Sequence, residues 1–516
     1  MTHCTHLLRR ELRPAAPLWE YADQPDSGNG VFLLDSALPA DGLGRYTLLG
    51  LEPAALLTAR RQAPGDPAPD GWRGPGRAAV ITRTTWRTAG GDHCPEPLIN
   101  RQPGDPLLAL RNLLAEYRPL QSRAGGEDPL PFTAGLVGYF GYETAHFVED
   151  LPDQGTDDLG VPDLAFWVID EVAAHDHQTG LTVLNVVGRG PDPARARQDA
   201  ETRATCWQKL LCRPPAPATE SDAGSPGPVR AHFDARTYSD EVQRCREHIL
   251  AGDVFEVCLT HRLEADLEGR PWELYRRLRA INPAPFASWL QFPELQIISA
   301  SPERFLSLNA GGRVQSRPIK GTRPRGSTPA EDRALRAELA TAEKDRAENL
   351  MIVDLVRSDL GRVAEIGSVC VPELLAVEEY ATVFQLVSTV EARLRKEFDA
   401  FDLVSATFPG GSMTGAPKIE ALKIIDRLEP VKRGVYSGAI GYIDHSGAMD
   451  LAMVIRTLVC RGGRATCGVG GAVVADSDPV AEYRETLDKA RAPIRALGLD
   501  PDAAHTLCPP PAGGRP

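Results

Sequence analysis

The 516-residue sequence lacks the features of membrane proteins and of nucleic-acid-binding proteins. It has no apolar run near the ~18 residues that a membrane-spanning helix needs. Residues 1–10 carry His and Arg but no hydrophobic core of the kind found in signal peptides. Basic residues are the minority, 57 against 70 acidic ones, and the net charge of −13 repels phosphate backbones and anionic membranes. We therefore expect a cytoplasmic protein with no membrane or nucleic-acid partner.

Paired cysteines are missing as well. The ten cysteines are scattered, with no CxxC pair and no His-x₃-His motif nearby, which argues against a zinc site or a redox dithiol. The 47 glycines and 44 prolines stay below the level of low-complexity sequence, and 42% of the residues are hydrophobic. The chain can therefore bury a sizeable core, and its length predicts about two to four domains or one large composite.

One stretch of the chain is too rich in proline to join a core. Residues 212–228 hold five prolines and no large apolar residue. We expect a linker over residues 212–229 between an N-terminal region, 1–211, and a C-terminal region, 230–500. Residues 501–516 are expected to form a disordered tail. A second Pro/Gly-rich stretch, residues 63–76, predicts a surface insertion between strands at 46–58 and 78–86.

Two histidines fall in a predicted hairpin. Alternating residues predict strands at 165–173 and 181–187, so that His175 and His177 lie in the turn between them. A His-x-His pair can bind a metal, but solvent-exposed turn histidines are far commoner.

The C-terminal region mixes helices and strands. The pattern predicts an α+β fold in which a large antiparallel β-sheet assembly has helices outside it. The predicted helices span 238–251 and 271–280, and a three-stranded meander is predicted at 436–443, 449–460 and 465–475.

Three glutamates stand out from their helical context. Glu348 lies on the apolar stripe of a predicted helix over 341–360, where a charge needs a partner or an ion. Glu482, Glu485 and Lys489 share one face of a helix that begins at Asp478-Pro479. Carboxylates converging without His or Cys suit Mg²⁺, whereas surface salt bridging is the ordinary alternative.

Glu303 and Lys320 flank a hairpin signal at Gly311-Gly312. A two-residue turn there places Glu303 opposite Lys320 as a cross-strand pair. The alternative is an exposed ion pair of no chemical role.

A glycine-rich loop over residues 408–418 leads into an apolar-periodic helix. Its backbone N–H groups and the helix N-terminus predict an anion site, here for a carboxylate. Arg456 can supply a bidentate carboxylate contact, or it extends to solvent instead.

Together these motifs resemble the chorismate-utilising enzymes, which include component I of anthranilate synthase and, more closely, component I of aminodeoxychorismate synthase. The resemblance runs from about residue 235 to 495 and is weaker before it. It implies the chorismate-binding enzyme fold of two packed sheets. The matching blocks are residues 252–257, 282–286, 301–305, 318–323, 347–355, 408–418 and 481–486.

The resemblance implies a reaction. Anthranilate synthases carry alanine at the position of Lys320, whereas aminodeoxychorismate synthases carry lysine. Lys320 would attack C2 of chorismate as the C4 hydroxyl leaves, and ammonia would add at C4 to give 4-amino-4-deoxychorismate for p-aminobenzoate, in folate or secondary metabolism. An amine attacks only when neutral, so the site is expected to lower the pKa of Lys320, with Glu303 taking or returning protons.

The resemblance also implies ligands for a metal and for the substrate. Glu348 and Glu485 match Mg²⁺ ligands, with Glu482 beside them. A tryptophan pocket, regulatory or structural, would include Leu34, Ser36, Pro285 and Phe286. The positions expected to line chorismate are Gly321, Thr322, Thr414, Tyr436, Arg456, Gly470, Gly471 and Lys489.

Two departures and one absence qualify this picture. Phe384-Gln385 replaces a family histidine, and Glu256 and Cys258 stand where many relatives have Gln and Asn. No cysteine lies in the Gly-x-Cys-x-Gly turn of a glutaminase, so a separate glutaminase subunit is implied to supply ammonia. The alternatives are anthranilate synthase component I and a catalytically silent, tryptophan-binding regulatory homologue.

Overall fold

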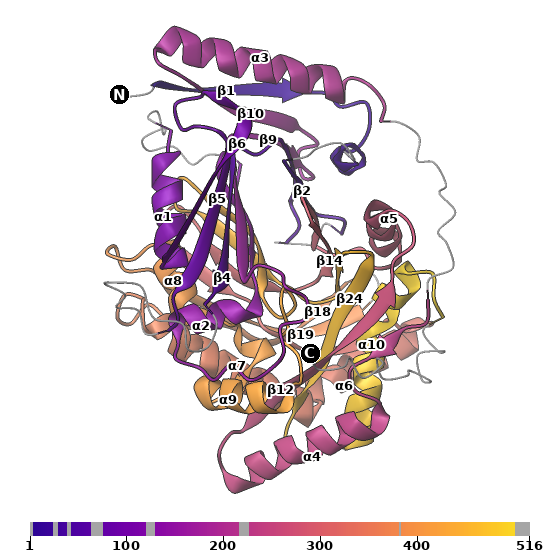
Figure 1. The fold of residues 1–516 in the computed structure, drawn as a ribbon. Coiled ribbons are helices and arrows are strands. Elements are labelled where there is room, and N and C mark those ends of the chain that lie inside the picture. Colours follow the sequence, from indigo (N-terminus) through magenta and orange to yellow (C-terminus); the bar gives the residue numbers. More distant parts are fainter. Residues whose placement is uncertain are drawn as a thin grey trace.

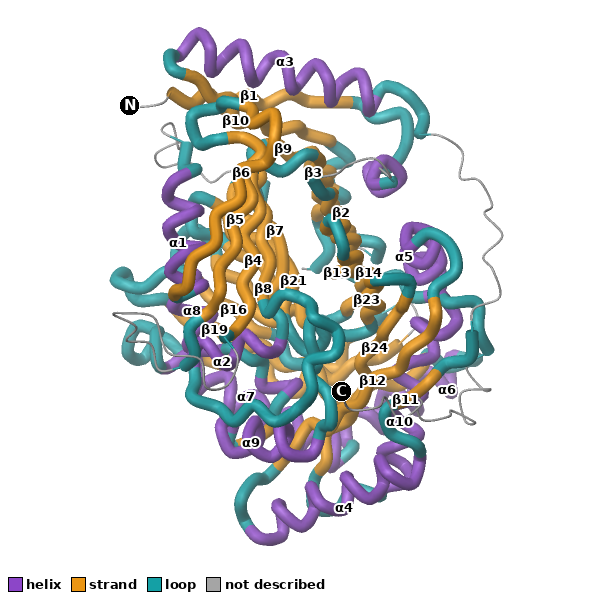
Figure 2. Tube along the Cα trace, in the orientation of Figure 1, coloured by secondary structure: helices purple, strands orange, loops and turns teal. Residues whose placement is uncertain are grey.

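Two large antiparallel sheets face each other and carry helices on their outer sides (Figures 1 and 2). The computed structural model describes residues 4–23, 29–38, 43–62, 76–119, 130–215, 227–380 and 383–500. This architecture confirms the predicted α+β fold. Most of the predicted linker, nearly all of the predicted insertion and the whole predicted tail lie outside the described residues. Among the described helices, none is long and apolar enough to cross a membrane.

The first sheet draws strands from both sides of the predicted linker. Its central strands β2, β13 and β14 join the N-terminal part of the chain to the C-terminal part. The strand order is β1 (Cys4–Leu12), β10 (Thr182–Gly190), β9 (Glu171–Asp176), β3 (Tyr46–Leu51), β2 (Val31–Asp35), β13 (Phe286–Phe292), β14 (Leu295–Ser301), β23 (Thr457–Arg461), β24 (Arg464–Val473), β12 (Glu256–Asp266) and β11 (Arg230–Ala231), and β20 (Gly415–Ala416) also pairs with β12.

The second sheet is built in the same mixed way. Strand β21 from the C-terminal part pairs with β7 from the N-terminal part. The order is β17 (Ile319–Pro324), β19 (Val383–Arg393), β16 (Arg313–Ser316), β15 (Arg304–Leu308), β22 (Met449–Met453), β21 (Ala439–Asp444), β7 (Gly135–Phe140), β8 (Leu164–Ile169), β4 (Ala55–Arg61), β5 (Ala79–Arg87) and β6 (His93–Gly104), and β18 (Cys370–Glu379) also pairs with β19.

Helices cover the outer faces of both sheets. Against the first sheet pack α3 (Pro193–Leu211), α4 (Ala235–Ala251), α5 (Pro271–Ile281), α9 (Lys418–Leu428) and α10 (Pro479–Ala496). The second sheet side carries α1 (Pro106–Glu116), α6 (Pro329–Thr341), α7 (Glu343–Gly361) and α8 (Ala400–Thr407), while α2 (Ala145–Val148) is a single turn. The helices predicted at 238–251, 271–280 and 341–360 are thereby confirmed.

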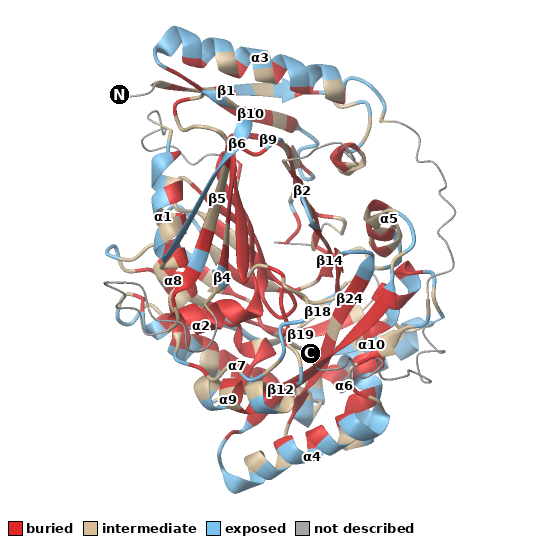
Figure 3. Cartoon of the chain, in the orientation of Figure 1, coloured by how far each residue is buried: buried red, intermediate tan, exposed pale blue. Residues whose placement is uncertain are grey.

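The core between the sheets is apolar and aromatic, and Figure 3 shows buried residues along the facing strands. Trp167 of β8 stacks on Phe292 of β13, with ring centroids 3.8 Å apart. Because these rings come from opposite sheets, their burial holds the two sheets together.

Three strands predicted as continuous are in fact broken, and the chain changes sheet at each break. Residues 46–58 form β3 and β4, residues 165–173 form β8 and β9, and residues 449–460 form β22 and β23. The last break contains Arg456 in the left-handed region, at φ 54°. Apolar residues continue on both sides of each break, so the pattern could not reveal the crossing.

The hairpin expected around two histidines is present as β9 and β10, but His175 lies in β9 rather than in the turn. The rings of His175 and His177 hydrogen-bond with Thr182 and Thr47, respectively. One ring nitrogen of each imidazole is therefore hydrogen-bonded to a threonine hydroxyl.

Candidate active site

Lys320 lies on β17, at the edge of the second sheet. The pairing of β17 with β19 is regular at Ile319 and again at Thr322, and the register shifts between them. Gly321 takes φ +84° in this bulge, and a Cβ there would lie 2.8 Å from the Asp345 carboxyl carbon. Glycine is needed because the bulge requires the left-handed conformation beside a crowded neighbour.

The side chain of Lys320 reaches across to the first sheet. Its Nζ donates to Oε1 of Glu256 on β12 at 2.8 Å, and Glu256 is fully buried. The second oxygen of Glu256, Oε2, is buried with no hydrogen-bond partner among the described residues. Sequence reasoning noted Glu256 only as a departure from relatives, because the contact joins residues 64 positions apart.

The predicted cross-strand pairing of Glu303 with Lys320 is wrong. Strands β15 and β16 pair Ser307 with Gln315, one residue away from the predicted register. Lys320 belongs to β17, which pairs with β19 instead.

The expected lowering of the Lys320 pKa is also wrong for this state of the protein. Burial alone would lower the pKa, but the carboxylates of Glu256 and Glu348 outweigh it and hold the pKa well above its usual range. Lys320 is therefore an ammonium ion, paired with Glu256.

Glu303 lies where the chain passes from β14 in the first sheet to β15 in the second. It is buried, and the Ser412 hydroxyl donates to its Oε1 at 2.8 Å. Burial raises the pKa of Glu303 from 4.5 to about 7, although Ser412 and Lys320 oppose the shift. Near neutral pH this carboxyl can therefore hold or release a proton.

The glutamates predicted to bind a metal come together as a carboxylate cluster of Glu348 on α7 and Glu482 and Glu485 on α10. Lys344 links them, because its Nζ lies 2.9 Å from Glu482 Oε1 and 3.8 Å from Glu348 Oε1. Lys489 pairs with Glu485 at 2.7 Å. Sequence reasoning missed Lys344, although its spacing of four residues from Glu348 signals a helical ion pair.

The carboxylate cluster leaves oxygen atoms available to a cation. Glu482 Oε2 is buried without a hydrogen-bond partner in the described part of the chain. A Cβ on Gly471 of β24 would meet Glu482 Oε2 at 3.0 Å and Glu485 Oε1 at 3.8 Å, so both carboxylates face this glycine. Burial raises the pKa of Glu348 to about 7.

The glycine-rich loop reaches the same region. Its strand β20 pairs with β12, placing Ala416 opposite Glu256. Thr414 is fully buried, and its carbonyl accepts from the Cys258 backbone N–H at 2.7 Å. The helix expected after the loop is α9, which begins at Lys418. The loop therefore lies against the Glu256–Lys320 pair.

The other expected substrate-lining residues gather around β24 and α10. Arg456 donates to the Lys489 carbonyl at 3.2 Å, and Lys489 Nζ donates to the Gly470 carbonyl at 2.8 Å. The Tyr436 ring lies against Gly468, where a Cβ would clash at 2.1 Å. In the second sheet, Thr322 of β17 pairs with Gln385 of β19, the residue in place of the family histidine.

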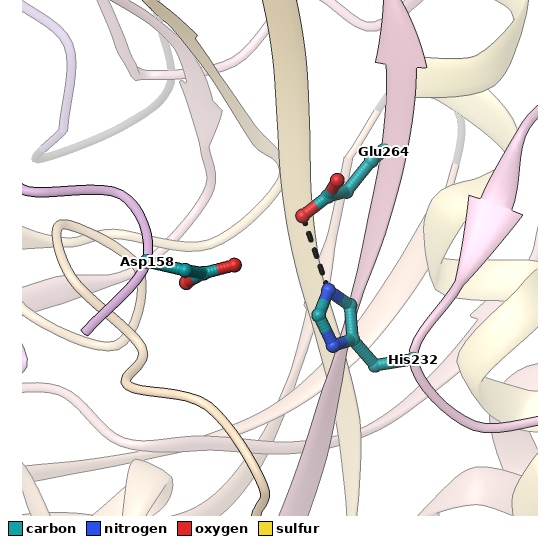
Figure 4. Close-up of side chains that lie close together, drawn as sticks. All are labelled: Asp158, His232 and Glu264. Carbon is teal, nitrogen blue, oxygen red and sulfur yellow. Dashed lines mark hydrogen bonds and ion pairs between the residues drawn. The ribbon is translucent and has the colours of Figure 1, made fainter. Parts of the chain in front are cut away.

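A second group of ligand-type side chains consists of Asp158, His232 and Glu264, which Figure 4 shows close together. His232 and Glu264 are 3.1 Å apart. The Arg262 guanidinium pairs with Asp158 and, at 2.8 Å, with Glu264. Because this guanidinium already pairs with both carboxylates, the group fits an ion-pair network better than a metal site.

The four residues expected in a tryptophan pocket line one cavity of about 280 Å³. Leu34 and Ser36 come from β2 and its end, and Pro285 and Phe286 come from the start of β13. Charged groups at its wall include Asp35, Arg45 and Arg304. The cavity can hold an aromatic amino acid with its charged ends paired.

Comparison with known proteins supplies close relatives of two named activities. An aminodeoxychorismate synthase of Streptomyces griseus is 43% identical over 472 residues, covering 91% of this chain but only 61% of that protein's length. An anthranilate synthase component 1 of Streptomyces coelicolor is 44% identical over 418 residues, 78% of this chain and 80% of that protein. An aminodeoxychorismate synthase component 1 of Bacillus subtilis is 37% identical over 456 residues, 88% of this chain and 90% of that protein.

A solved structure and a family model agree with these relatives. Anthranilate synthase component I from Streptococcus pneumoniae matches the fold with a TM-score of 0.69 at 32% identity, covering 88% of this chain and 92% of that one. The family model described as chorismate binding enzyme matches residues 83–495. The chain belongs to the family of chorismate binding enzymes.

Proposed function

We propose that this chain aminates chorismate at C4, giving 4-amino-4-deoxychorismate, as component I of an aminodeoxychorismate synthase. The observation that carries the proposal is the position of Lys320. The bulge at Gly321 lies beside it, its amine contacts Glu256, and the charges of Glu303 and the carboxylate cluster act on it. Overall identity favours neither activity, since the Streptomyces coelicolor anthranilate synthase component 1 is as similar as the Streptomyces griseus aminodeoxychorismate synthase. Lys320 supports the aminodeoxychorismate synthase activity, since the family resemblance places alanine there in anthranilate synthases.

The reaction divides into two substitutions. Lys320 Nζ bonds to C2 of chorismate while the bond between C4 and its hydroxyl breaks and the ring double bonds shift. Ammonia then bonds to C4, the double bonds shift back and Lys320 leaves C2. Glu303, with a pKa of about 7, gives a proton to the departing hydroxide, which leaves as water.

Mg²⁺ suits the carboxylate cluster, because Lys344 lies between Glu348 and Glu482 and because Glu482 Oε2 is buried without a partner among the described residues. Glu348, Glu482 and Glu485 would hold it. When bound, the cation supplies positive charge for the ring carboxylate of chorismate. Lys344 would then give up its ion pair with Glu482.

The chain's own cations and backbone groups would hold the rest of the substrate. Arg456 and Lys489 would pair with the enolpyruvyl carboxylate, beside Tyr436. Backbone groups of the expected lining residues Gly321, Thr322, Thr414, Gly470 and Gly471 would border the substrate. All these residues, and the proposed catalytic and metal-binding ones, fall in the C-terminal region 230–500.

The proposal includes a partner and a second ligand. Because the sequence lacks a glutaminase nucleophile turn, a separate glutaminase subunit would supply ammonia in the cytoplasm. Tryptophan is proposed for the 280 Å³ cavity, where Arg45, Asp35 and Ser36 offer partners for its charged ends.

Product analysis tests this function. Purified protein is incubated with chorismate, Mg²⁺ and ammonium, and the products are resolved by mass. The expected product keeps its enolpyruvyl group and carries nitrogen at C4. Anthranilate with free pyruvate would instead assign the chain to anthranilate synthase, and unchanged chorismate would favour a silent regulatory homologue.

A further inference from the structure

Lys320 cannot act as a nucleophile in the state that the structure shows. Its amine is an ammonium ion hydrogen-bonded to Glu256 at 2.8 Å, and no lone pair is free to attack carbon. The proton must leave Nζ before a bond to C2 can form. A proton passes directly only to an atom that is already within hydrogen-bond reach.

One acceptor meets this condition. Among the described residues, the hydrogen bond and the ion pair of Lys320 both go to Glu256. Glu303 is bonded to Ser412 instead, and no ion pair within 4.0 Å joins it to Lys320 in the described chain. Glu303 therefore keeps the role of giving a proton to the departing hydroxide.

We propose that Glu256 is the catalytic base that takes the proton from Lys320, an inference that rests on the proposed C4 amination. The proton moves from Lys320 Nζ to Glu256 Oε1, the freed electron pair forms the bond to C2, and hydroxide leaves C4 with a proton from Glu303. In the second substitution Lys320 regains its electron pair as it leaves C2. The adding ammonia loses one proton to Glu303, and the proton held by Glu256 returns to the amine of Lys320, which restores the starting state.

The surroundings of the pair favour this transfer over loss of the proton to solvent. Glu256 is fully buried and its Oε2 has no hydrogen-bond partner among the described residues, so the carboxylate is poorly solvated. Moving one proton converts a buried ion pair into two neutral groups without moving charge to the surface. The other titratable groups that act on Lys320 are Glu348, Cys258, Glu303 and Glu485.

The same geometry accounts for a glutamate where many relatives carry glutamine. A glutamine amide can accept a hydrogen bond from the ammonium ion but cannot hold its proton. Glu256 thus converts a hydrogen-bond position into a base for the lysine beside it. Cys258, two residues along β12, is buried and neutral, since burial raises the pKa of its thiol.

The test compares Glu256→Gln and Glu256→Asp with wild type at fixed free NH₃ and saturating Mg²⁺ from pH 6.5 to 9. In Glu256→Gln the lysine must lose its proton to solvent first. We expect the amination rate of Glu256→Gln to be roughly 100-fold below that of wild type at pH 7. The ratio of the two rates should then recover about tenfold per pH unit. Glu256→Asp keeps a carboxylate, so its ratio to wild type should not change with pH.

Each outcome separates the alternatives. A Glu256→Gln to wild-type rate ratio that stays constant with pH would overturn the proposal, as would an Asp variant that follows the Gln variant. Glu391→Gln, which alters a carboxylate paired with exposed Arg313, is the matched control and should leave rates unchanged. If wild type itself fails to form the 4-amino product, the proposed function is refuted. This result comes from wild type alone and is distinct from the comparison of variants.

Discussion

Replacing Glu303 by glutamine should stabilise the protein at alkaline pH while removing its activity. Burial raises the pKa of Glu303 from 4.5 to about 7, so the folded state holds this proton more tightly than the unfolded chain does. The contribution of Glu303 to stability therefore falls as pH rises from about 4.5 to 7 and stays lower above that range. Each pKa unit corresponds to about 1.4 kcal/mol, which gives a loss of about 3 kcal/mol.

Glutamine carries no titrating proton, and its carbonyl can still accept the hydrogen bond from Ser412. The free energy of unfolding of Glu303→Gln, relative to wild type, should therefore increase by about 2.5 kcal/mol between pH 5 and pH 8. Other buried carboxyls titrate equally in both proteins and cancel in the difference.

Urea denaturation followed by tryptophan fluorescence, in EDTA at several pH values, measures this difference. Glu391→Gln serves as the control and should show no trend over this pH range, because the pKa of Glu391 is lowered. A stability difference between Glu303→Gln and wild type that is constant from pH 5 to 8 would refute the account of a proton held by burial. Turnover of Glu303→Gln should drop roughly 10²- to 10⁴-fold, as expected when an acid catalyst is lost.

Three further predictions concern the metal, the nitrogen source and the bulge. Glu348→Gln or Glu485→Gln should lower Mg²⁺-dependent turnover at least roughly 100-fold, and undiminished turnover in excess EDTA would remove the metal from the mechanism. The isolated chain should use ammonium but not glutamine, so glutamine-dependent turnover by pure protein would contradict the need for a glutaminase subunit. Gly321→Ala should lose turnover and at least about 1 kcal/mol of unfolding free energy. The control is Gly312→Ala, which has a similar φ of +83° but a nearest contact at 3.7 Å and should keep turnover.

Local signals in the sequence were sufficient for individual elements. The α10 start at Asp478-Pro479 and the apolar stripe that contains Glu348 could be read from spacing alone, because capping and helical periodicity are short-range properties. The convergence of the carboxylate cluster followed from the family resemblance, since the sequence spacing between α7 and α10 carries no information on their distance.

The sheet crossings could not be predicted in the same way. Strands β8 and β9 are separated by Asp170 alone, yet they belong to different sheets. Asp170 is held by a buried ion pair with Arg189 of β10 at 2.7 Å. Because every residue of β8 and all but one of β9 are buried, the apolar pattern is the same on either side of the crossing.

The partner of Lys320 could not be predicted from the sequence for a related reason. A hairpin rule compares residues on neighbouring strands, and it selected Glu303. The observed partner, Glu256, lies on the other sheet and contacts Lys320 only because the sandwich brings β17 and β12 together. Its charge reverses the expected direction of the lysine pKa shift.

The mass of the protein after exposure to a chorismate analogue tests the central claim, covalent catalysis by Lys320, most directly. The analogue carries a good leaving group at C4, and wild type and Lys320→Ala are compared by intact mass and peptide mapping. The account predicts that wild type gains the mass of the ring on the peptide containing Lys320, and that Lys320→Ala gains nothing and yields at most a trace of 2-amino product or anthranilate from chorismate. Full C4 amination by Lys320→Ala, with no adduct on wild type, would contradict it.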